Sequence, residues 1–195
     1  METETIERAD TLTLSAGALF DLVTGALVCA GGNKEPVKYS SVYLVSDGET
    51  LSARATDKFR LIIGTISAPG AVFAVQLTRR DSERVTSLCK PFIKLKGEVS
   101  LSLLDGGVLR VAIPGEGIIE VSNLGDTFPD TSALLGLPGV EVSAIKLDAG
   151  RLATFSKVPS DKSPVTLTFS GVTKPVTLEI NHPVIAWQAL LMPCK

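Results

Sequence analysis

The amino-acid sequence predicts an α+β protein in which one βαβββ unit occurs three times. The first observation is an order of elements: a short strand-like run precedes a segment with helical apolar periodicity, and three further strand-like runs follow it. The second is the punctuation of those runs by Gly, Pro and Asp residues, which is typical of hairpin turns. The third is recurrence, because the same order begins again at Thr11, Phe73 and Val140.

The first unit shows the pattern most clearly. Ser15 is a favourable N-cap for a helix, and Leu19, Val23 and Leu27 recur at the spacing of one helical face. Asp47 and Gly48 form a turn between two strands. The elements predicted for this unit are a strand over 11–14, a helix over 15–29, and strands over 42–46, 50–55 and 59–66.

The other two units repeat this order. Thr78 is the expected N-cap of the second helix, and the third helix begins at Asp148. The second unit is predicted as a strand over 73–77, a helix over 79–88, and strands over 98–103, 108–113 and 118–121. The third is predicted as a strand over 140–145, a helix over 148–157, and strands over 165–170, 176–180 and 186–192.

A segment rich in Pro, Gly and small polar residues, 128–139, precedes the third unit and is the expected linker. We therefore expect a full domain over residues 1–127 and a half domain over 128–195. A single βαβββ unit has one helix and leaves strand edges unpaired, so it needs a neighbour. The first two units can serve each other. The third is expected to have no partner in its own chain, which predicts self-association.

Composition excludes several classes of protein. The 195 residues are 45% hydrophobic and 21% charged, as in ordinary globular proteins, and the net charge of -2 argues against a protein that coats nucleic acid. No run of 18 apolar residues occurs and residues 1–10 are polar, so we expect a cytoplasmic protein with no membrane span. Cys29, Cys89 and Cys194 are widely spaced and are expected to be buried thiols rather than disulfides or zinc ligands.

The sequence offers no catalytic machinery. His182 is the one histidine and lies in a predicted turn, which leaves neither a Ser/His/Asp triad nor a histidine-based metal site. No phosphate-binding glycine motif is present. Trp187 lies in an apolar strand, where a core position is the main interpretation and stacking on a base the alternative. We expect no enzyme activity, no cofactor and no metal.

Three short motifs occur in register with the repeat. They are Ala-Thr-Asp-Lys-Phe-Arg-Leu over 55–61, Phe-Pro-Asp over 128–130, and Leu-Leu-Met-Pro-Cys-Lys over 190–195. With the repeated βαβββ order they resemble the bacterial DNA polymerase III β sliding clamp family, in a shortened form that suggests a phage protein. The resemblance covers residues 11–195, and the family pattern places the three motifs in the middle domain, at the following joint and at the C-terminus.

Size is the departure from the family. The resemblance implies a fold with three domains, hence six units a chain, and a dimeric ring whose twelve helices line a hole for duplex DNA. This chain looks like the middle domain, 1–127, joined to the closing half of the last domain, 128–195. If a ring still needs twelve units, four chains supply them. The resemblance therefore favours a homo-oligomer, and a tetramer with two-fold related neighbours.

The resemblance also implies an apolar cleft that receives a short linear peptide from the replicative DNA polymerase and the clamp loader. Peptides of this kind place apolar anchors in a pocket. The alternative for Phe59, Leu61 and Leu190 is a purely structural core position. Carried over by motif, the cleft residues are Tyr39, Thr56, Lys58, Phe59, Arg60, Leu61, Pro129, Leu134, Leu190, Met192, Pro193 and Cys194.

Sequence-independent contact with duplex DNA requires cations on the helices that face the hole. The alternative is a solvated helix face that has no ligand. The helix of the first unit carries no cation between Ser15 and Gly32, so the lining would be unevenly basic. The expected DNA-facing residues are Arg79, Arg80, Arg84, Lys90, Lys146, Arg151 and Lys157.

The sequence thus predicts a sliding clamp, a processivity factor that encircles DNA and tethers replication proteins. One alternative is a clamp mimic that binds the same peptides without encircling DNA. Another is a β-rich structural protein in which the motifs are coincidental.

Overall fold

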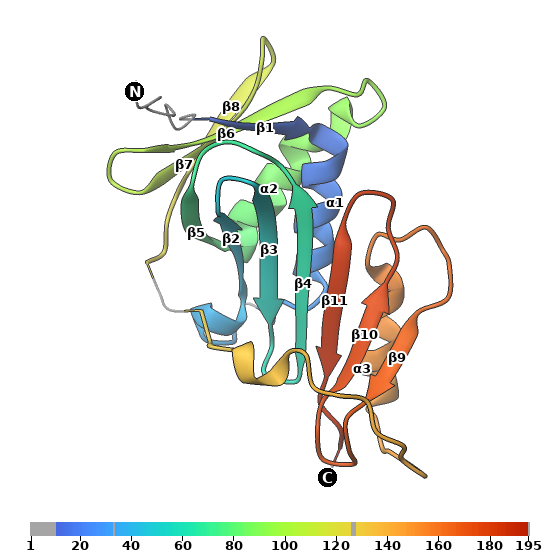
Figure 1. Cartoon of the computed structure of the whole chain (residues 1–195). Coiled ribbons are helices and arrows are strands. Elements are labelled where there is room, and N and C mark those ends of the chain that lie inside the picture. The colour runs from blue at the N-terminus through green and yellow to red at the C-terminus, as the bar shows by residue number, and fades with distance from the viewer. Residues whose placement is uncertain (1–10, 33, 126–127, 195) are drawn as a thin grey trace, which may run out of the picture.

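The computed structural model describes residues 11–32, 34–125 and 128–194. Their elements follow the predicted repeat, except for the first strand of the third unit (Figure 1). The first unit contains β1 (Leu12–Ser15), α1 (Ala16–Leu27), η1 (Val37–Tyr39), β2 (Ser41–Ser46), β3 (Thr50–Thr56) and β4 (Arg60–Ser67). The second contains β5 (Phe73–Thr78), α2 (Arg79–Cys89), η2 (Lys90–Phe92), β6 (Glu98–Leu104), β7 (Val108–Ile113) and β8 (Gly117–Ser122). The linker and third unit contain η3 (Ser132–Leu134), α3 (Ala149–Thr154), η4 (Phe155–Lys157), β9 (Thr166–Phe169), β10 (Val176–Ile180) and β11 (Ala186–Leu191).

The predicted helix starts are confirmed by their capping bonds. The side chain of Ser15 accepts a hydrogen bond from the Ala18 N–H at 3.1 Å. Thr78 caps α2 in the same way at 2.9 Å, and Asp148 caps α3 at 2.8 Å. A side-chain oxygen at this position satisfies one of the N–H groups that the first helical turn leaves free.

Two antiparallel sheets carry the repeat. The smaller has the strand order β1-β6-β7-β8, and the larger has the order β5-β2-β3-β4-β11-β10-β9. The first two units exchange their first strands, because β1 pairs with β6 of the second unit and β5 pairs with β2 of the first. This exchange confirms that the two units complete each other's sheets.

The third unit corrects one expectation. Its last strand, β11, pairs with β4 of the first unit over six residue pairs, from Ala186 opposite Thr65 to Leu191 opposite Arg60. The prediction that this unit has no partner in its own chain is therefore wrong for one of its two edges. A single sheet runs from the first unit into the third, and its other end is formed by β9.

The prediction of a strand over 140–145 is also wrong, because the structure has irregular backbone there. The alternating sequence meets the local requirement for a strand, but a strand also needs a hydrogen-bonding neighbour. In the first two units each first strand finds that neighbour in the other unit. Among the described residues, the third unit has no such counterpart.

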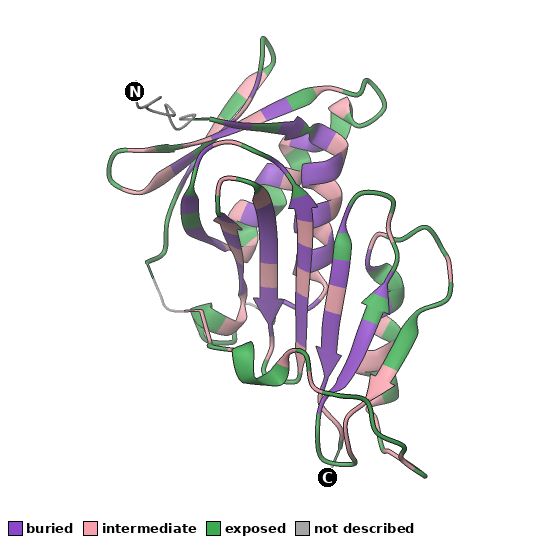
Figure 2. Cartoon of the chain, in the orientation of Figure 1, coloured by how far each residue is buried: buried purple, intermediate pink, exposed green. Residues whose placement is uncertain are grey.

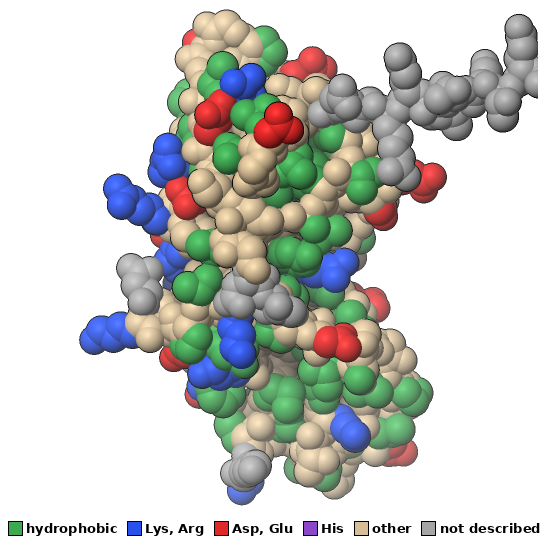
Figure 3. Space-filling model, turned by 90° about the vertical axis from the view of Figure 1, so that its left-hand side faces the viewer, with side chains coloured by type: hydrophobic (Ala, Val, Ile, Leu, Met, Phe, Trp, Pro, Cys, Tyr) green, Lys and Arg blue, Asp and Glu red, His purple; other side chains and the backbone are tan. Residues whose placement is uncertain are grey.

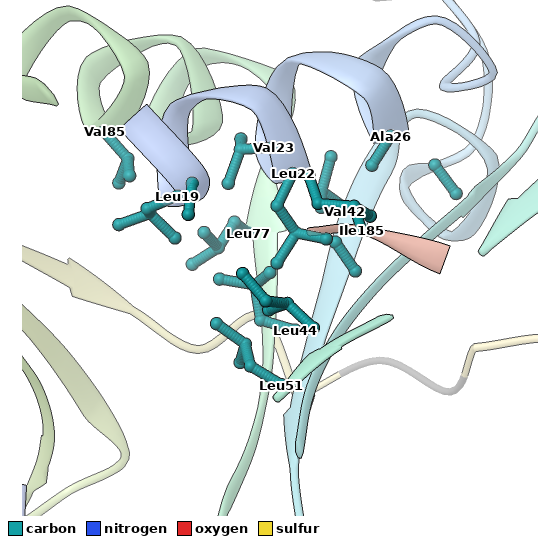
Figure 4. Close-up of a cluster of buried hydrophobic side chains, with 14 of the residues drawn as sticks. Leu19, Leu22, Val23, Ala26, Val42, Leu44, Leu51, Leu77, Val85 and Ile185 are labelled. Carbon is teal, nitrogen blue, oxygen red and sulfur yellow. The ribbon is translucent and has the colours of Figure 1, made fainter. Parts of the chain in front are cut away.

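The core lies between the sheets and the helices (Figures 2 and 4). Leu19, Leu22 and Val23 of α1 are fully buried and belong to one cluster with Leu44 of β2 and Leu77 of β5. Figure 1 shows the three α-helices behind the seven-stranded sheet, on one side of the molecule. Within residues 11–32, 34–125 and 128–194, no helix has the length and apolar character required to cross a lipid bilayer.

Candidate functional site

The turn between β3 and β4 is held by its own side chains. The Asp57 carboxylate accepts hydrogen bonds from the backbone N–H groups of Phe59 (3.0 Å) and Arg60 (2.7 Å). The Thr56 hydroxyl donates to the carbonyl of Arg60 at 2.7 Å and accepts from the N–H of Lys58 at 3.2 Å. Lys58 has a φ of 78°, which its Asx-type turn stabilises. The predicted loop residues are therefore presented in one fixed conformation.

Arg60 joins this turn to the third unit. Its Nε and Nη2 groups donate to one oxygen of Asp57 at 2.9 and 2.7 Å, and the two side chains are 12% and 14% exposed. Nη1 donates to the hydroxyl of Thr154 on α3. A charged pair with this degree of burial depends on such hydrogen bonds for its stability. The sequence placed Arg60 in the cleft but gave no signal of its contact with Thr154.

Phe59 is the exposed apolar side chain of the turn, at 45% exposure. The guanidinium of Arg151 lies 3.8 Å from the centre of its ring, a cation–π contact. The carbonyl of Phe59 accepts a hydrogen bond from the N–H of Met192 at 2.9 Å. The turn, α3 and the C-terminal segment therefore meet at this residue.

The C-terminal segment supplies the next part of the site. Leu190 pairs with Leu61 across the β4–β11 pair, and these side chains are 3% and 4% exposed. Both side chains are therefore buried, which agrees with the alternative interpretation that they are core residues rather than a surface open to a ligand. Met192 and Pro193 are half-buried, and Cys194 is exposed. The N–H of Cys194 donates to the carbonyl of Lys146 at 2.8 Å, which holds the segment against the third unit.

Tyr39 lies beside the same turn. The Lys58 ammonium is 4.7 Å from the centre of the Tyr39 ring and 3.1 Å from the carboxylate of Glu35. The Lys38 ammonium is 5.3 Å from the centre of the same ring. These contacts place two lysines and an aromatic ring next to the turn.

The linker residues occupy a groove on the outer face of the large sheet. Pro129 lines a hollow of about 460 Å³ together with Tyr43 of β2 and Arg54 of β3. Phe128 stacks on Tyr43 with centroids 5.4 Å apart and an interplanar angle of 7°. The N–H of Ser132 donates to the Asp130 carboxylate, and this hydrogen bond is the main reason why the pKa of Asp130 is lowered.

Sequence reasoning missed Tyr43 and Arg54 as groove residues. Their only signal was an outward position on alternating strands, which many surface residues share. Leu134 ends η3 and is 36% exposed. The structure therefore brings together the turn, the C-terminal segment and Tyr39, and it places Pro129 in a groove lined by strands β2 and β3.

The predicted basic residues of α2 have different environments. Arg79 donates to the carbonyls of Leu27, Ala30 and Gly31 at 3.3, 2.7 and 3.2 Å, so its guanidinium covers the C-terminal end of α1. Arg84 is exposed and lies 3.0 Å from Asp81. The remaining cations of this stretch, Arg80 and Lys90, are exposed.

In the third unit, Lys146 and Lys157 are exposed, while Arg151 is shared between Phe59 and, at 3.9 Å, the carboxylate of Asp148. Figure 3 turns the left-hand side of Figure 1 toward the viewer, so the side of the helices forms its left edge. Lys and Arg side chains project along that edge.

The cysteines confirm two of three expectations. Cys29 and Cys89 are fully buried, and burial raises their pKa values to about 12 and about 11. The expectation for Cys194 is wrong, because it follows the last strand and is exposed. Trp187 is 3% exposed, which confirms its core position.

His182 lies in the turn before β11, where its Nδ1 accepts from the N–H groups of Val184 and Ile185 at 3.2 and 3.1 Å. Its Nε2 is 3.4 Å from Asp21. The predicted turn role is confirmed. In the part of the chain that the structure describes, no cluster of His, Cys, Asp and Glu is placed to hold a metal.

With its two interlocked βαβββ units, continued edge to edge into a third unit that lacks the first strand, the described chain has the fold of bacterial DNA polymerase III β sliding clamps. The chain is similar to the sliding clamp of Pseudomonas aeruginosa, with a TM-score of 0.78 and 13% identity over 96% of this chain and 67% of that one. It is also similar to the β subunit of Thermotoga maritima, with a TM-score of 0.80 and 10% identity over 100% of this chain and 68% of that one.

A third similar structure is the clamp of Bartonella birtlesii bound to griselimycin, with a TM-score of 0.76 and 16% identity over 100% of this chain and 68% of that one. No protein-family model matches the sequence, and no curated protein matches it. The chain thus has about two thirds of the length of a clamp protomer, and its likeness to clamps lies in the fold.

Proposed function

We propose that the protein is a homo-oligomeric DNA sliding clamp, a non-enzymatic processivity factor that encircles duplex DNA in the cytoplasm and tethers a replicative polymerase. The pairing of β4 with β11 carries the proposal. It continues one sheet from the first unit into the third while α1 and α3 stay on the same side (Figure 1). Repeated between chains, this arrangement builds a wall with helices inside and sheets outside.

Unit counting sets the size of the proposed ring. The chain has the three units of one full domain, 1–127, and one half domain, 128–195, and four chains would supply twelve. Edges remain for neighbours in the described chain, because β1 and β8 end the smaller sheet and β5 and β9 end the larger one. Since the last strands of the first and third units pair with each other, the last strand of the second unit, β8, would meet β8 of another copy in an isologous contact.

Weak attraction to phosphates suits a protein that slides. Arg80, Arg84 and Lys90 are the exposed cations of α2 and its end, and Lys146 and Lys157 add to them in the third unit. Arg79 and Arg151 are partly buried against intramolecular partners, whereas the other five are exposed. We therefore assign the main contribution to those five, including Arg84, which stays exposed although it pairs with Asp81. Partner proteins would dock away from these cations, at the proposed cleft beside the β3–β4 turn.

We define the cleft by its turn, Lys58–Leu61, and its C-terminal wall, Leu190–Cys194. Phe59 and Met192 offer apolar surface that is not fully buried, beside the cation of Lys58. Such a surface suits an extended peptide with one or two apolar anchors, from the polymerase or the clamp loader. Griselimycin, to which the similar Bartonella birtlesii clamp is bound, is the first probe for ligand binding at this cleft.

Retention on DNA tests the ring. The protein is loaded on a nicked circular plasmid with the loader of its replisome, and the mass of the free protein is measured by light scattering. A ring remains on the circle, leaves after linearisation, and has the mass of four chains. A monomer or dimer that binds cleft ligands without retention on the circle would instead be a clamp mimic, and the proposal would be rejected.

A further inference from the structure

The third unit repeats a sequence feature of the first two. In each unit a leucine directly precedes the N-cap of the helix: Leu14 before Ser15, Leu77 before Thr78, and Leu147 before Asp148. In the first two units this leucine lies in the exchanged strand. The third unit has the same residues, but they lie in irregular backbone.

The register of the exchange is the same in both observed cases. The N-cap residue faces the first residue of the other unit's strand, so Ser15 pairs with Glu98 and Thr78 pairs with Ser41. One position further, Leu14 faces Val99 and Leu77 faces Val42. The second residue of the accepting strand is therefore always apolar and opposite the leucine.

Leu167 is the equivalent second residue of β9. Val42 and Val99 are fully buried, whereas Leu167 is 40% exposed. Leu167 also pairs with Leu178, which is 1% exposed, so it lies on the core face of the sheet. An apolar residue on the core face that stays this exposed lacks the strand and helix that cover its two counterparts.

The outer edge of β9, next to Leu167, also has backbone groups that no strand of the described chain pairs with. β9 ends the large sheet, and among the described residues its far side receives one backbone hydrogen bond, from Val140 N–H to the carbonyl of Phe169. Groups two residues apart on a strand point the same way. The N–H and carbonyl of Leu167 therefore face the unpaired side, ready for a partner strand.

We propose that the third units of two copies exchange strands, with Asp148, Leu147 and Lys146 of one copy pairing antiparallel with Thr166, Leu167 and Thr168 of the other. The contact is isologous, since each copy gives one segment and accepts one. It ends at Phe169, whose carbonyl already binds Val140 of its own chain. The two half domains would then form one full domain with the interlocked topology of residues 1–127.

This inference names a second copy of the chain as the partner, and it deepens the proposed function, on which its purpose rests. Chains that meet alternately through β8 and through the third unit form assemblies with an even number of chains. Four chains supply the twelve units of the proposed ring. Strand exchange and encirclement remain separate properties, because exchange alone gives a dimer.

Crosslinking between two different chains tests the register. A chain with Leu147→Cys and a longer-tagged chain with Leu167→Cys, both also carrying Cys194→Ser, are co-expressed and oxidised. Directly opposite strand residues have the Cα separation that a disulfide requires, so a disulfide-linked heterodimer is expected. Pairing Leu147→Cys with Lys174→Cys, in the turn before β10, is the matched control and should give none. Absence of the heterodimer, or equal crosslinking in the control, overturns the inference.

A second variant keeps the test independent of disulfide formation. Leu167→Arg places a charge at a position that is already 40% exposed in the single chain, so the fold is retained while the contact is lost. Light scattering should show the mass of the assembly reduced to half, and Val172→Arg, at a 58% exposed turn position, should leave it unchanged. An unchanged mass for Leu167→Arg rejects the exchange. Crosslinking without retention on circular DNA would instead reject the ring alone.

Discussion

Trp187 and Gly64 face each other across the β4–β11 pair, and the indole ring fills the space where a side chain at position 64 would lie. A Cβ atom on Gly64 would be 2.2 Å from the ring, and one on Gly25 of α1 would be 2.3 Å from it. One aromatic side chain therefore closes the joint between the first and third units against two glycines. The absence of side chains at both positions is what allows this close approach.

Gly64→Ala tests this joint. The added methyl group forces the indole or the strand to shift, and overpacking of this kind costs about 1–3 kcal/mol in the free energy of unfolding. Urea denaturation should show that loss. Gly32→Ala is the matched control, because a Cβ atom there meets nothing within 4 Å. Equal stability of the Gly64 variant and the wild type would contradict the packing described here.

Phe59→Ala tests the proposed cleft. Phe59 is 45% exposed, so its replacement should lower the free energy of unfolding by little more than the cation–π contact with Arg151, about 0.5–1 kcal/mol, while it removes an apolar anchor. We expect the Kd for a cleft ligand to rise by about tenfold or more, as for a central contact residue. Fluorescence polarisation measures the Kd. Val184→Ala, 56% exposed in the turn before β11, is the control and should bind normally.

Replacement of Arg80 and Arg84 by Gln tests the DNA-facing assignment. If each contacts a phosphate, the slope of log K against log salt should become shallower by roughly one per residue removed. Retention on circular DNA at increasing salt provides the measurement. Arg110→Gln is the control: this residue pairs with Glu120 on the exposed face of β7 and β8. An unaltered salt slope in the double variant would remove α2 from the proposed lining.

Alkaline pH should destabilise the protein through Cys29 and Cys89. Their pKa values are raised to about 12 and about 11 from 9.0, so the folded state keeps protons that the unfolded state loses above pH 9. The free energy of unfolding should therefore fall with rising pH, by about 1.4 kcal/mol per pH unit for each thiol. The fall should continue to about pH 11 for Cys89 and to about pH 12 for Cys29.

The double variant Cys29→Ala, Cys89→Ala isolates this effect. Urea unfolding at pH 6 to 8, where neither thiol titrates, gives the packing loss alone. From pH 9 to 11 the variant should lose stability less steeply than the wild type. Parallel slopes would show that the two buried thiols do not contribute to the alkaline response.

Most elements were predictable because local patterns specify them. The caps Ser15 and Thr78 are recognisable from side-chain chemistry, and β10 begins and ends where the alternation predicts, at Val176 and Ile180. The strand over 140–145 was not predictable in this way. Its sequence alternates, but the backbone partner that decides the matter is missing from the described chain.

The candidate site likewise contains residues that the sequence predicts and residues that only the packing of the units brings to it. Thr56, Phe59 and Met192 were predicted from short motifs. In the structure the N–H of Met192 donates to the carbonyl of Phe59, and the Thr56 hydroxyl holds the same turn through the carbonyl of Arg60. Arg151 and Thr154, which contact the turn from α3, gave no such signal for this position. A contact between residues 59 and 151 depends on how two units pack, and no local pattern encodes that distance.

From the sequence alone we could predict three similar units, the residues at which their helices begin, and the short segments that carry apolar and basic side chains. Those properties follow from periodicity, capping and turn chemistry, which act within a few residues. The folded chain was needed to reveal that β11 pairs with the edge of β4, that Trp187 packs against Gly64, and that Leu167 remains exposed. Edge pairing and close packing join residues far apart in the chain, so they are fixed only when the units come together.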